Sequence, residues 1–332
     1  MIRFQGFTNS TSEAARQLGL PKPTPASREA GARTDARSRA DSARVCVLAL
    51  GGGGARGLAH FGATQAVFES GYRIHRIVGT SIGSLVGAML ATNQNTFEPL
   101  QRVIGYVESE DFKSKQDMLC GAHPKQTVTH HGLLGWYDQI RSFLWARQML
   151  TRVFRRRSFL SGQVIEDVIA DLVPDIDISD CITPLSIVAV DLKTGHQVVL
   201  EKGSLRRAVL ASTAIPGIFP PVLWEDMLLA DFGVLDSLPT QIARSYAPNA
   251  SVIGVDIGPR LDTVDDCESA LHVLLRMDEI SERLYRRHSY AHADFLIQPE
   301  VGEFEWFDFS EPRRLIRAGL EAGRAALAHN RI

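Results

Sequence analysis

Short apolar segments alternate with longer amphipathic segments from residue 45 onward. Residues 45–50 are continuously apolar and lead directly into four glycines, and residues 74–78 are a second predicted strand that also meets a glycine. Continuous apolar runs are typical of strands that are buried on both faces. A helical pattern follows each glycine turn, to about residue 70 and to about residue 92. The remaining pattern predicts strands over 185–190, 197–200, 228–230, 252–255 and 295–297, and helices over 162–172, 205–212, 240–244, 269–287 and 312–328.

This alternation of strands and helices predicts an α/β fold, with a mostly parallel central sheet and helices on both faces. We expect one domain over residues 45–328, with a helical insertion over about 103–160. Residues 1–44 are rich in Ala, Arg, Ser, Thr and Pro, and they carry eight basic and four acidic side chains. Such a segment buries too little apolar surface to offset the entropy of ordering, so we predict a disordered N-terminal tail.

The composition of the 332-residue chain is that of an ordinary globular protein, with 45% hydrophobic and 22% charged residues. A net charge of −2 gives no general affinity for nucleic acid, which is therefore not an expected partner. The four cysteines lie far apart without metal-ligand spacing, which predicts a reduced cytoplasmic protein without a metal site. The longest uncharged apolar stretch, residues 208–224, contains three prolines, so membrane contact is expected to be peripheral only.

The glycine-rich turn after the first strand is a candidate site for negative charge. It fits the pattern G-x-G-x-x-G with Gly52, Gly53, Gly54, Ala55, Arg56 and Gly57. Bare N–H groups at the start of a helix can hold a dinucleotide pyrophosphate or an oxyanion that forms during a reaction. A dinucleotide site also needs an acidic residue at the end of the second strand. Glu69 has about the right spacing but falls at a helix end, which disfavours a dinucleotide-binding oxidoreductase.

A second glycine turn contains a candidate nucleophile. Gly79, Ser81 and Gly83 form G-x-S-x-G between the second strand and a helix. In that setting the serine lies on a sharp turn with its Oγ exposed, and the glycines give the turn room. The carboxyl ends of adjacent parallel strands meet at one edge, so both glycine turns are expected to face one crevice. A nucleophile beside bare N–H donors is the minimum for acyl transfer.

A serine nucleophile needs a base that accepts its proton. Asp231 follows the apolar run 228–230 and precedes Gly233, which places it at the same edge of the sheet. An aspartate with the ordinary pKa of about 3.9 is a poor base at neutral pH unless desolvation raises that pKa. A Ser-His-Asp arrangement that uses His288 or His292 is the alternative within the same class of enzyme.

These three motifs, at 52–57, 79–83 and 231–233, together resemble the patatin-like phospholipase family, in particular compact bacterial members related to the catalytic part of neuropathy target esterase. Residues 212–216 and 219–221 also resemble the segment that precedes the family's catalytic aspartate, and the resemblance covers about 45–327. It implies a three-layer fold and a dyad of Ser81 and Asp231 without histidine. It also implies that the N–H groups of Gly52, Gly53 and Gly54 form the oxyanion hole.

The resemblance further implies a lipid acyl hydrolase of the phospholipase A, lysophospholipase or esterase type, with a phospholipid or lysophospholipid substrate and no cofactor. One position departs from the family: Phe232 follows Asp231 where the family has glycine. A ring there is expected to narrow the crevice or to resist a backbone with positive φ, which raises a lipid-binding protein with little turnover as an alternative. Arg56 matches the family's basic position and is interpreted as part of a structural ion pair.

Residues 133–157 form an amphipathic basic segment inside the predicted insertion. They carry six arginines and one aspartate, and their first half places apolar side chains on one helical stripe, namely Leu133, Trp136, Tyr137, Ile140, Phe143 and Leu144. This pattern predicts either a cap helix packed on the core or a peripheral membrane surface.

Overall fold

The computed structural model describes residues 44–93, 95–120, 162–233, 235–258, 267 and 270–328. The predicted tail, apart from Arg44, and the whole amphipathic segment 133–157 lie outside these residues. None of the described helices is both long enough and apolar enough to cross a membrane.

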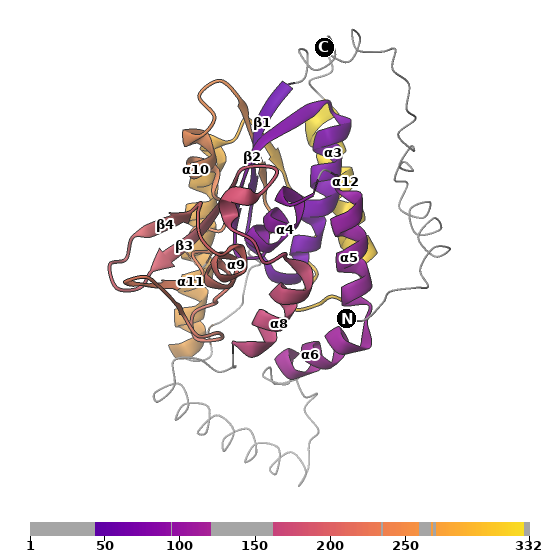
Figure 1. Ribbon diagram of the computed structural model, residues 1–332. Coiled ribbons are helices and arrows are strands. Elements are labelled where there is room, and N and C mark those ends of the chain that lie inside the picture. The colour runs from indigo at the N-terminus through magenta and orange to yellow at the C-terminus, as the bar shows by residue number, and fades with distance from the viewer. Residues whose placement is uncertain are drawn as a thin grey trace.

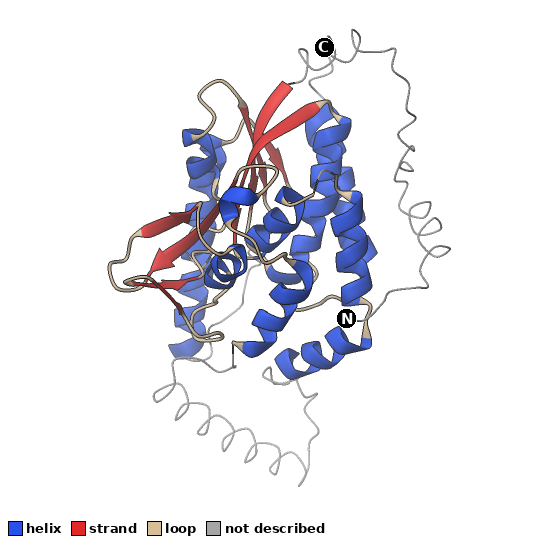
Figure 2. Cartoon of the chain, in the orientation of Figure 1, coloured by secondary structure: helices blue, strands red, loops and turns tan. Residues whose placement is uncertain are grey.

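One eight-stranded sheet forms the centre of the described structure (Figures 1 and 2). Its strands are β1 (Arg44–Leu50), β2 (Tyr72–Thr80), β3 (Leu185–Asp191), β4 (Gln197–Leu200), β5 (Val222–Trp224), β6 (Met227–Ala230), β7 (Ser251–Val255) and β8 (Phe295–Ile297). The order is β5-β6-β3-β2-β1-β7-β8, and β4 pairs with β3. The pairs among β3, β2, β1, β7 and β8 are parallel, whereas β4, β5 and β6 join by antiparallel pairs. The predicted α/β fold with a mostly parallel sheet is confirmed.

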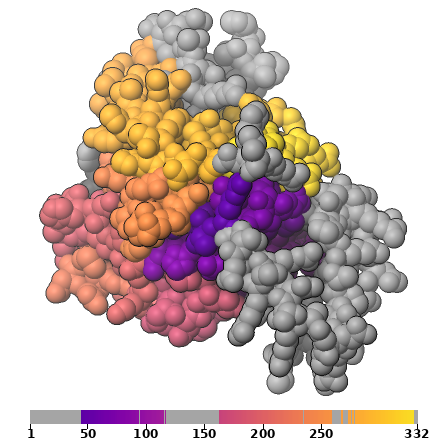
Figure 3. Space-filling model, turned by 90° about the horizontal axis from the view of Figure 1, so that it is seen from above, coloured from indigo at the N-terminus to yellow at the C-terminus, as the bar shows by residue number. Residues whose placement is uncertain are grey.

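Helices cover both faces of this sheet. The α-helices are α3 (Ala59–Glu69), α4 (Ile82–Ala91), α5 (Phe97–Val107), α6 (Glu110–Cys120), α8 (Gln163–Leu172), α9 (Leu205–Ser212), α10 (Thr240–Ser245), α11 (Ala270–Ser289) and α12 (Pro312–Ala328). Short 3₁₀ helices occupy Gly54–Leu58 (η1), Ile178–Asp180 (η2) and Tyr290–His292 (η3). Seen from the end where β1 begins, the N-terminal segments in indigo and purple lie between C-terminal segments in gold and middle segments in red (Figure 3).

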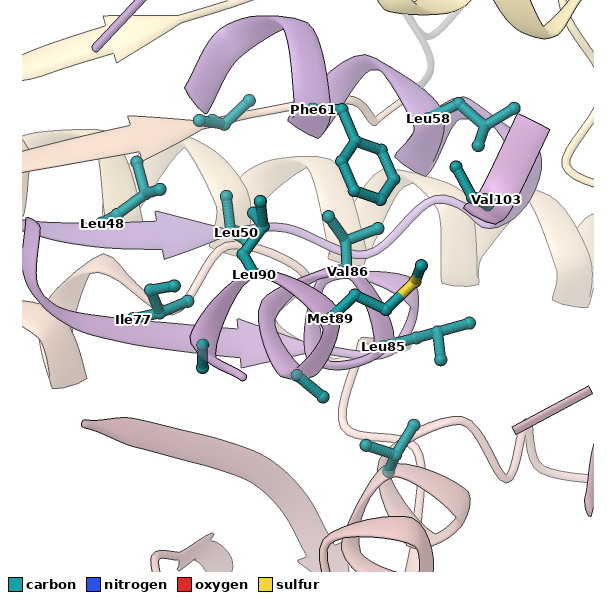
Figure 4. Close-up of a cluster of buried hydrophobic side chains, with 14 of the residues drawn as sticks. Leu48, Leu50, Leu58, Phe61, Ile77, Leu85, Val86, Met89, Leu90 and Val103 are labelled. Atoms are coloured by element: carbon teal, nitrogen blue, oxygen red, sulfur yellow. The ribbon is translucent and has the colours of Figure 1, made fainter. Parts of the chain in front are cut away.

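The side chains of β1 explain why its sequence is continuously apolar. Cys46, Leu48 and Leu50 belong to the larger core cluster, which also includes residues of α3, α4, α5 and α12 (Figure 4). Val47 and Ala49 point to the other face and pack in a smaller cluster with residues of α10. All five are fully buried. A strand that is covered on both faces needs no polar alternation.

The structure differs from the predicted elements at several places. The second strand, β2, runs over Tyr72–Thr80 and is longer than the predicted 74–78. Its first residues belong to the strand because they pair with the start of β1, where Tyr72 lies opposite Arg44. The helix predicted up to residue 70 divides into η1 and α3. The pattern did not predict β5, whose three residues are too short for periodicity to show, nor the start of α5 before residue 103.

Candidate active site

Strand register brings the two glycine turns together. Leu50, the last residue of β1, pairs with Gly79 of β2 on one side and with Val255 of β7 on the other. The chain therefore leaves β1 and β2 side by side at the carboxyl edge of the sheet. A Cβ atom built on Gly52 would lie 3.3 Å from the Cβ of Ser81, so the glycine loop lies directly against the serine. This juxtaposition agrees with the prediction that both turns face one crevice.

Ser81 lies on a strained turn between β2 and α4. Its φ of 54° and ψ of −127° are rarely adopted by a residue with a side chain, and such a conformation costs about 1–3 kcal/mol. The surrounding structure holds it in place, because the Ser81 N–H donates to the Ser212 Oγ at 2.9 Å. The Ser212 hydroxyl in turn donates to the carbonyl oxygen of Val188 at 2.7 Å. This arrangement has the geometry of a nucleophile elbow.

The glycines of the elbow are required by close packing. A Cβ on Gly83 would lie 2.2 Å from the carbonyl oxygen of Leu50, and one on Gly79 would lie 2.5 Å from the carbonyl oxygen of Gly83. The first turn of α4 therefore packs against the ends of the strands at backbone contact distance, which directs the Ser81 side chain toward the edge of the sheet.

The structure brings Ser81 and Asp231 into direct contact, although 150 residues separate them. The Ser81 Oγ donates to the Asp231 Oδ2 at 2.5 Å, and the Gly233 N–H donates to the Asp231 Oδ1 at 2.7 Å. Burial raises the pKa of Asp231 to about 6, and the two hydrogen bonds oppose this rise without cancelling it. The carboxylate is therefore ionised at neutral pH and is a far stronger base than an exposed aspartate.

The backbone at Phe232 does not have the positive φ that would conflict with a side chain. Among the described residues other than glycine, only Ser81 and Glu225 have positive φ, so the backbone at position 232 accepts a side chain. The Phe232 ring is partly buried and packs against the smaller core cluster, which includes Val47 and Ala49. The predicted conflict with a positive φ is therefore wrong, whereas narrowing of the crevice by the ring stays a prediction.

The glycine loop has two N–H groups that no described residue occupies. The Gly52 N–H donates to the carbonyl oxygen of Ser237 at 2.8 Å, so it is already satisfied within the protein. Gly53 and Gly54 have φ values of 154° and 61°, and their N–H groups have no hydrogen-bond partner in the described part of the chain. Of the three N–H groups that the resemblance implies for the oxyanion hole, those of Gly53 and Gly54 are available to a ligand, and that of Gly52 is not.

Polar groups behind the loop fix its position. His60 is fully buried and its Nε2 lies 2.8 Å from the Gly51 carbonyl oxygen, and burial lowers the pKa of His60 to about 4. The ring is therefore neutral, with Nε2–H as the donor. On the other side, the Ser237 Oγ donates to Glu282, which lies 3.6 Å from Arg286. The sequence motifs gave no signal for Ser237 or Glu282, because neither residue lies within a recognisable pattern.

The other candidate residues have structural roles or lie away from the dyad. The Nε and Nη1 atoms of Arg56 are buried without a hydrogen-bond partner among the described residues, and the interpretation of Arg56 as part of a structural ion pair stays a prediction. Burial holds the pKa of Arg56 below its usual range. Glu69 is the last residue of α3 and forms an ion pair with Arg324 at 2.8 Å. It therefore does not lie at the end of the second strand, where a dinucleotide site needs an acidic residue.

No described histidine contacts the dyad. Within the described residues, the Asp231 carboxylate accepts hydrogen bonds from the Ser81 Oγ and the Gly233 N–H. His288 is exposed on α11, and His292 ends η3. Within the described ranges, no group of three His, Cys, Asp or Glu side chains could hold a metal ion, and Cys46, Cys181 and Cys267 are free thiols. The Ser-His-Asp alternative therefore has no geometric support.

Comparison with known proteins agrees with this geometry. The family model described as patatin-like phospholipase matches residues 48–244. The chain belongs to the patatin-like phospholipase family. Members of this family are lipid hydrolases. The matched segment contains the glycine loop, the serine elbow and the aspartate motif.

The relatives share the domain but are longer proteins. An uncharacterized NTE family protein of Mycobacterium tuberculosis is 32% identical over 232 residues, which is 68% of this chain and 54% of that protein. Neuropathy target esterase sws of Drosophila melanogaster is 28% identical over 218 residues, covering 65% of this chain and 13% of that protein. The crystal structure of VipD from Legionella pneumophila has a TM-score of 0.44 at 14% identity, with 87% of this chain and 67% of that chain covered. The chain spans about half the length, or less, of the curated relatives it matches.

Proposed function

We propose that the chain is a serine lipid acyl hydrolase that cleaves carboxyl esters of phospholipids or lysophospholipids through a Ser81–Asp231 dyad. The observation that carries the proposal is the 2.5 Å hydrogen bond from the Ser81 Oγ to a buried carboxylate, beside a glycine loop with unoccupied N–H groups. Membership of the patatin-like phospholipase family supports a lipid as the substrate.

In the first half of the reaction, Asp231 accepts the proton of Ser81 while the Oγ attacks the carbonyl carbon of the ester. The electron pair of the C=O bond moves to oxygen, and the N–H groups of Gly53 and Gly54 stabilise the resulting oxyanion. The tetrahedral intermediate collapses, the bond to the alkoxy oxygen breaks, and Asp231 gives its proton to the leaving alcohol. The acyl group remains on Ser81 as an ester.

In the second half, water attacks the acyl group after Asp231 takes one of its protons. The same N–H groups stabilise the second oxyanion, and the intermediate releases the fatty acid while the proton returns to the Ser81 Oγ. Each step uses only groups of the chain and water. The raised pKa of Asp231 suits both its acid and its base role near neutral pH.

An apolar cavity in the described structure could hold part of an acyl chain. It has a volume of about 360 Å³, lies between α8, α9 and β5, and is lined mainly by apolar groups, among them Ile165, Leu210 and Phe219. Its volume is sufficient for part of a hydrocarbon chain, and its lining includes no residue of the dyad or of the glycine loop.

The test is covalent labelling with a fluorophosphonate, followed by measurement of fatty acid release from phosphatidylcholine and lysophosphatidylcholine. The native chain is expected to be labelled and to release fatty acid, whereas Ser81→Ala abolishes both and Asp231→Asn lowers both by about 10³-fold or more. Ser245→Ala, an exposed serine of α10, serves as the matched control and leaves both unchanged.

Three other outcomes would contradict the proposal. Labelling that survives in Ser81→Ala would place the nucleophile elsewhere. Loss of turnover in a variant with His288→Ala and His292→Ala would favour a histidine base. A native chain that binds lipid but neither reacts with the probe nor releases fatty acid would favour the lipid-binding alternative.

A further inference from the structure

Exposed apolar side chains concentrate on one helix, α11. The described residues include ten large hydrophobic side chains that are exposed, and five of them belong to this helix. They are Val273, Leu274, Met277, Leu284 and Tyr285, with exposed fractions from 46% to 67%. Their spacing of three, four, seven and eight residues places them along one side of an α-helix, and we call this set the α11 stripe.

The opposite side of α11 is fixed to the protein next to the glycine loop. Glu282 accepts the hydrogen bond of Ser237, whose carbonyl oxygen holds the Gly52 N–H. Arg286 is 4% exposed and lies 3.6 Å from Asp256, the residue that follows β7. The stripe therefore lies on the side of α11 opposite Glu282 and Arg286, the two charged residues that attach this helix to the rest of the protein.

Because of the direction of α11, the stripe extends past the carboxyl edge of the sheet, the edge at which Ser81 and Asp231 lie. The helix leads back toward the start of β8, which is parallel to β7, so α11 runs antiparallel to the strands. Glu282 and Arg286 lie at the carboxyl edge, beside Ser237 and Asp256. The twelve residues before Glu282 span about 18 Å and extend past this edge. In Figure 1, α11 begins at the lower end of the molecule, toward which β1 and β2 run.

We propose that the α11 stripe is the surface on which the protein docks onto a lipid bilayer. A bilayer fits because the stripe lies on the side from which an ester substrate must reach Ser81, and this step rests on the proposed function. Leu, Met and Tyr side chains suit shallow insertion at the headgroup boundary, and the exposed guanidinium of Arg287 suits anionic headgroups. A stripe one helix wide is narrow for a stable dimer, whose interface buries roughly 1,200 Å² or more.

The experiment measures partitioning onto vesicles of equal parts phosphatidylcholine and phosphatidylglycerol, using the full chain with Ser81→Ala so that no lipid is consumed. Leu274→Ser with Met277→Ser is expected to lower the partition coefficient about tenfold or more, because two apolar side chains no longer insert. Leu284→Ser, a second variant, is expected to lower it by a smaller factor.

The matched control is Ile182→Ser. Ile182 is 59% exposed, as apolar as the residues of the stripe, and it precedes β3 at the opposite edge of the sheet. This variant is expected to bind vesicles like its parent. Circular dichroism melting curves establish that all variants are equally folded.

Vesicle binding that is unchanged in both stripe variants, or absent in the parent, would overturn the proposal. A change from dimer to monomer in the stripe variants, seen by light scattering without loss of vesicle binding, would assign the face to a second copy of the chain. Probe labelling of Ser81 in the native chain is measured separately. A chain that binds through the stripe but is not labelled contradicts only the proposed hydrolase function, and a labelled chain that does not bind contradicts only the docking surface.

Discussion

The serine elbow and the glycine loop lie side by side at one edge of the sheet, but they are held in different ways. The elbow is fixed by close backbone packing, because Gly79 and Gly83 let the first turn of α4 touch the strand ends, and by one hydrogen bond from the Ser81 N–H to Ser212. The glycine loop is fixed by hydrogen bonds to groups outside it. The His60 ring is close in the sequence, whereas the Ser237 carbonyl oxygen and the Trp306 carbonyl oxygen, which accepts the Ala55 N–H at 2.6 Å, come from distant parts of the chain.

This contrast matches the roles proposed for the two turns, nucleophile and oxyanion donor. A nucleophile needs an exposed oxygen in one strained conformation, which local packing can impose. Oxyanion donors need N–H groups that stay unpaired in the resting protein, so the carbonyl groups around them must be occupied by other donors. The elbow should therefore respond to changes in its own glycines, and the loop should respond to changes in side chains far along the sequence.

The largest effect is expected from Gly83→Ala in the elbow. The new Cβ would lie 2.2 Å from the Leu50 carbonyl oxygen, so α4 must move away from β1. We expect the free energy of unfolding to fall by about 3 kcal/mol or more, measured by urea denaturation. Gly105→Ala on α5 is the control, because nothing lies within 4 Å of its Cβ position. Its free energy of unfolding should rise by about 0.5–1 kcal/mol, since alanine favours a helix more than glycine does. Equal stability of the two variants would mean that the elbow is not closely packed.

An intermediate effect is expected at Asp231, which contacts the elbow through Ser81. Folding raises the pKa of this carboxyl from 3.8 to about 6, so its ionisation opposes folding. The resulting loss in the free energy of unfolding grows as the pH rises from about 4 to about 6, and it reaches its full size above that range. Asp231→Asn should therefore raise the free energy of unfolding by about 1–3 kcal/mol at about pH 8, with a smaller gain at about pH 4. Thermal melts at both pH values check this.

The activity of the native protein should depend on the same ionisation. Because Asp231 must be ionised to accept the proton of Ser81, kcat/KM is expected to fall about tenfold per pH unit below a midpoint near 6. A midpoint near 4 would indicate a carboxyl that is not desolvated by the fold.

The smallest effect is expected from Ser237→Ala behind the glycine loop. The carbonyl oxygen that holds Gly52 remains, but the link from the Ser237 Oγ to Glu282 is lost. We expect kcat to fall about 3- to 10-fold with KM and stability nearly unchanged, because only the orientation of the oxyanion donors is relaxed. Ser245→Ala on the exposed side of α10 should leave kcat unchanged. Equal rates for both variants would show that the loop is rigid without this contact.

Most of the fold was predictable because β1 is buried on both faces and the helices have one apolar side. The candidate serine and aspartate were predictable because each comes at the end of a predicted strand and lies two residues from a glycine. The sequence could not predict that the Gly52 N–H is already hydrogen-bonded, because its acceptor, the Ser237 carbonyl oxygen, lies 185 positions further along the chain. The burial of the Arg56 guanidinium was equally unpredictable, because the groups that surround it come from distant segments of the chain.

By itself, the sequence determined the alternation of strands and helices, the two glycine turns and the candidate nucleophile and base, because these depend on local periodicity and on residue types that only certain turns accept. The tertiary structure alone decided that Asp231 is buried with a raised pKa, that Gly53 and Gly54 are the free donors, and that α11 has an apolar face outside the core. These properties depend on which groups from distant segments displace water from one another, and no local pattern records that.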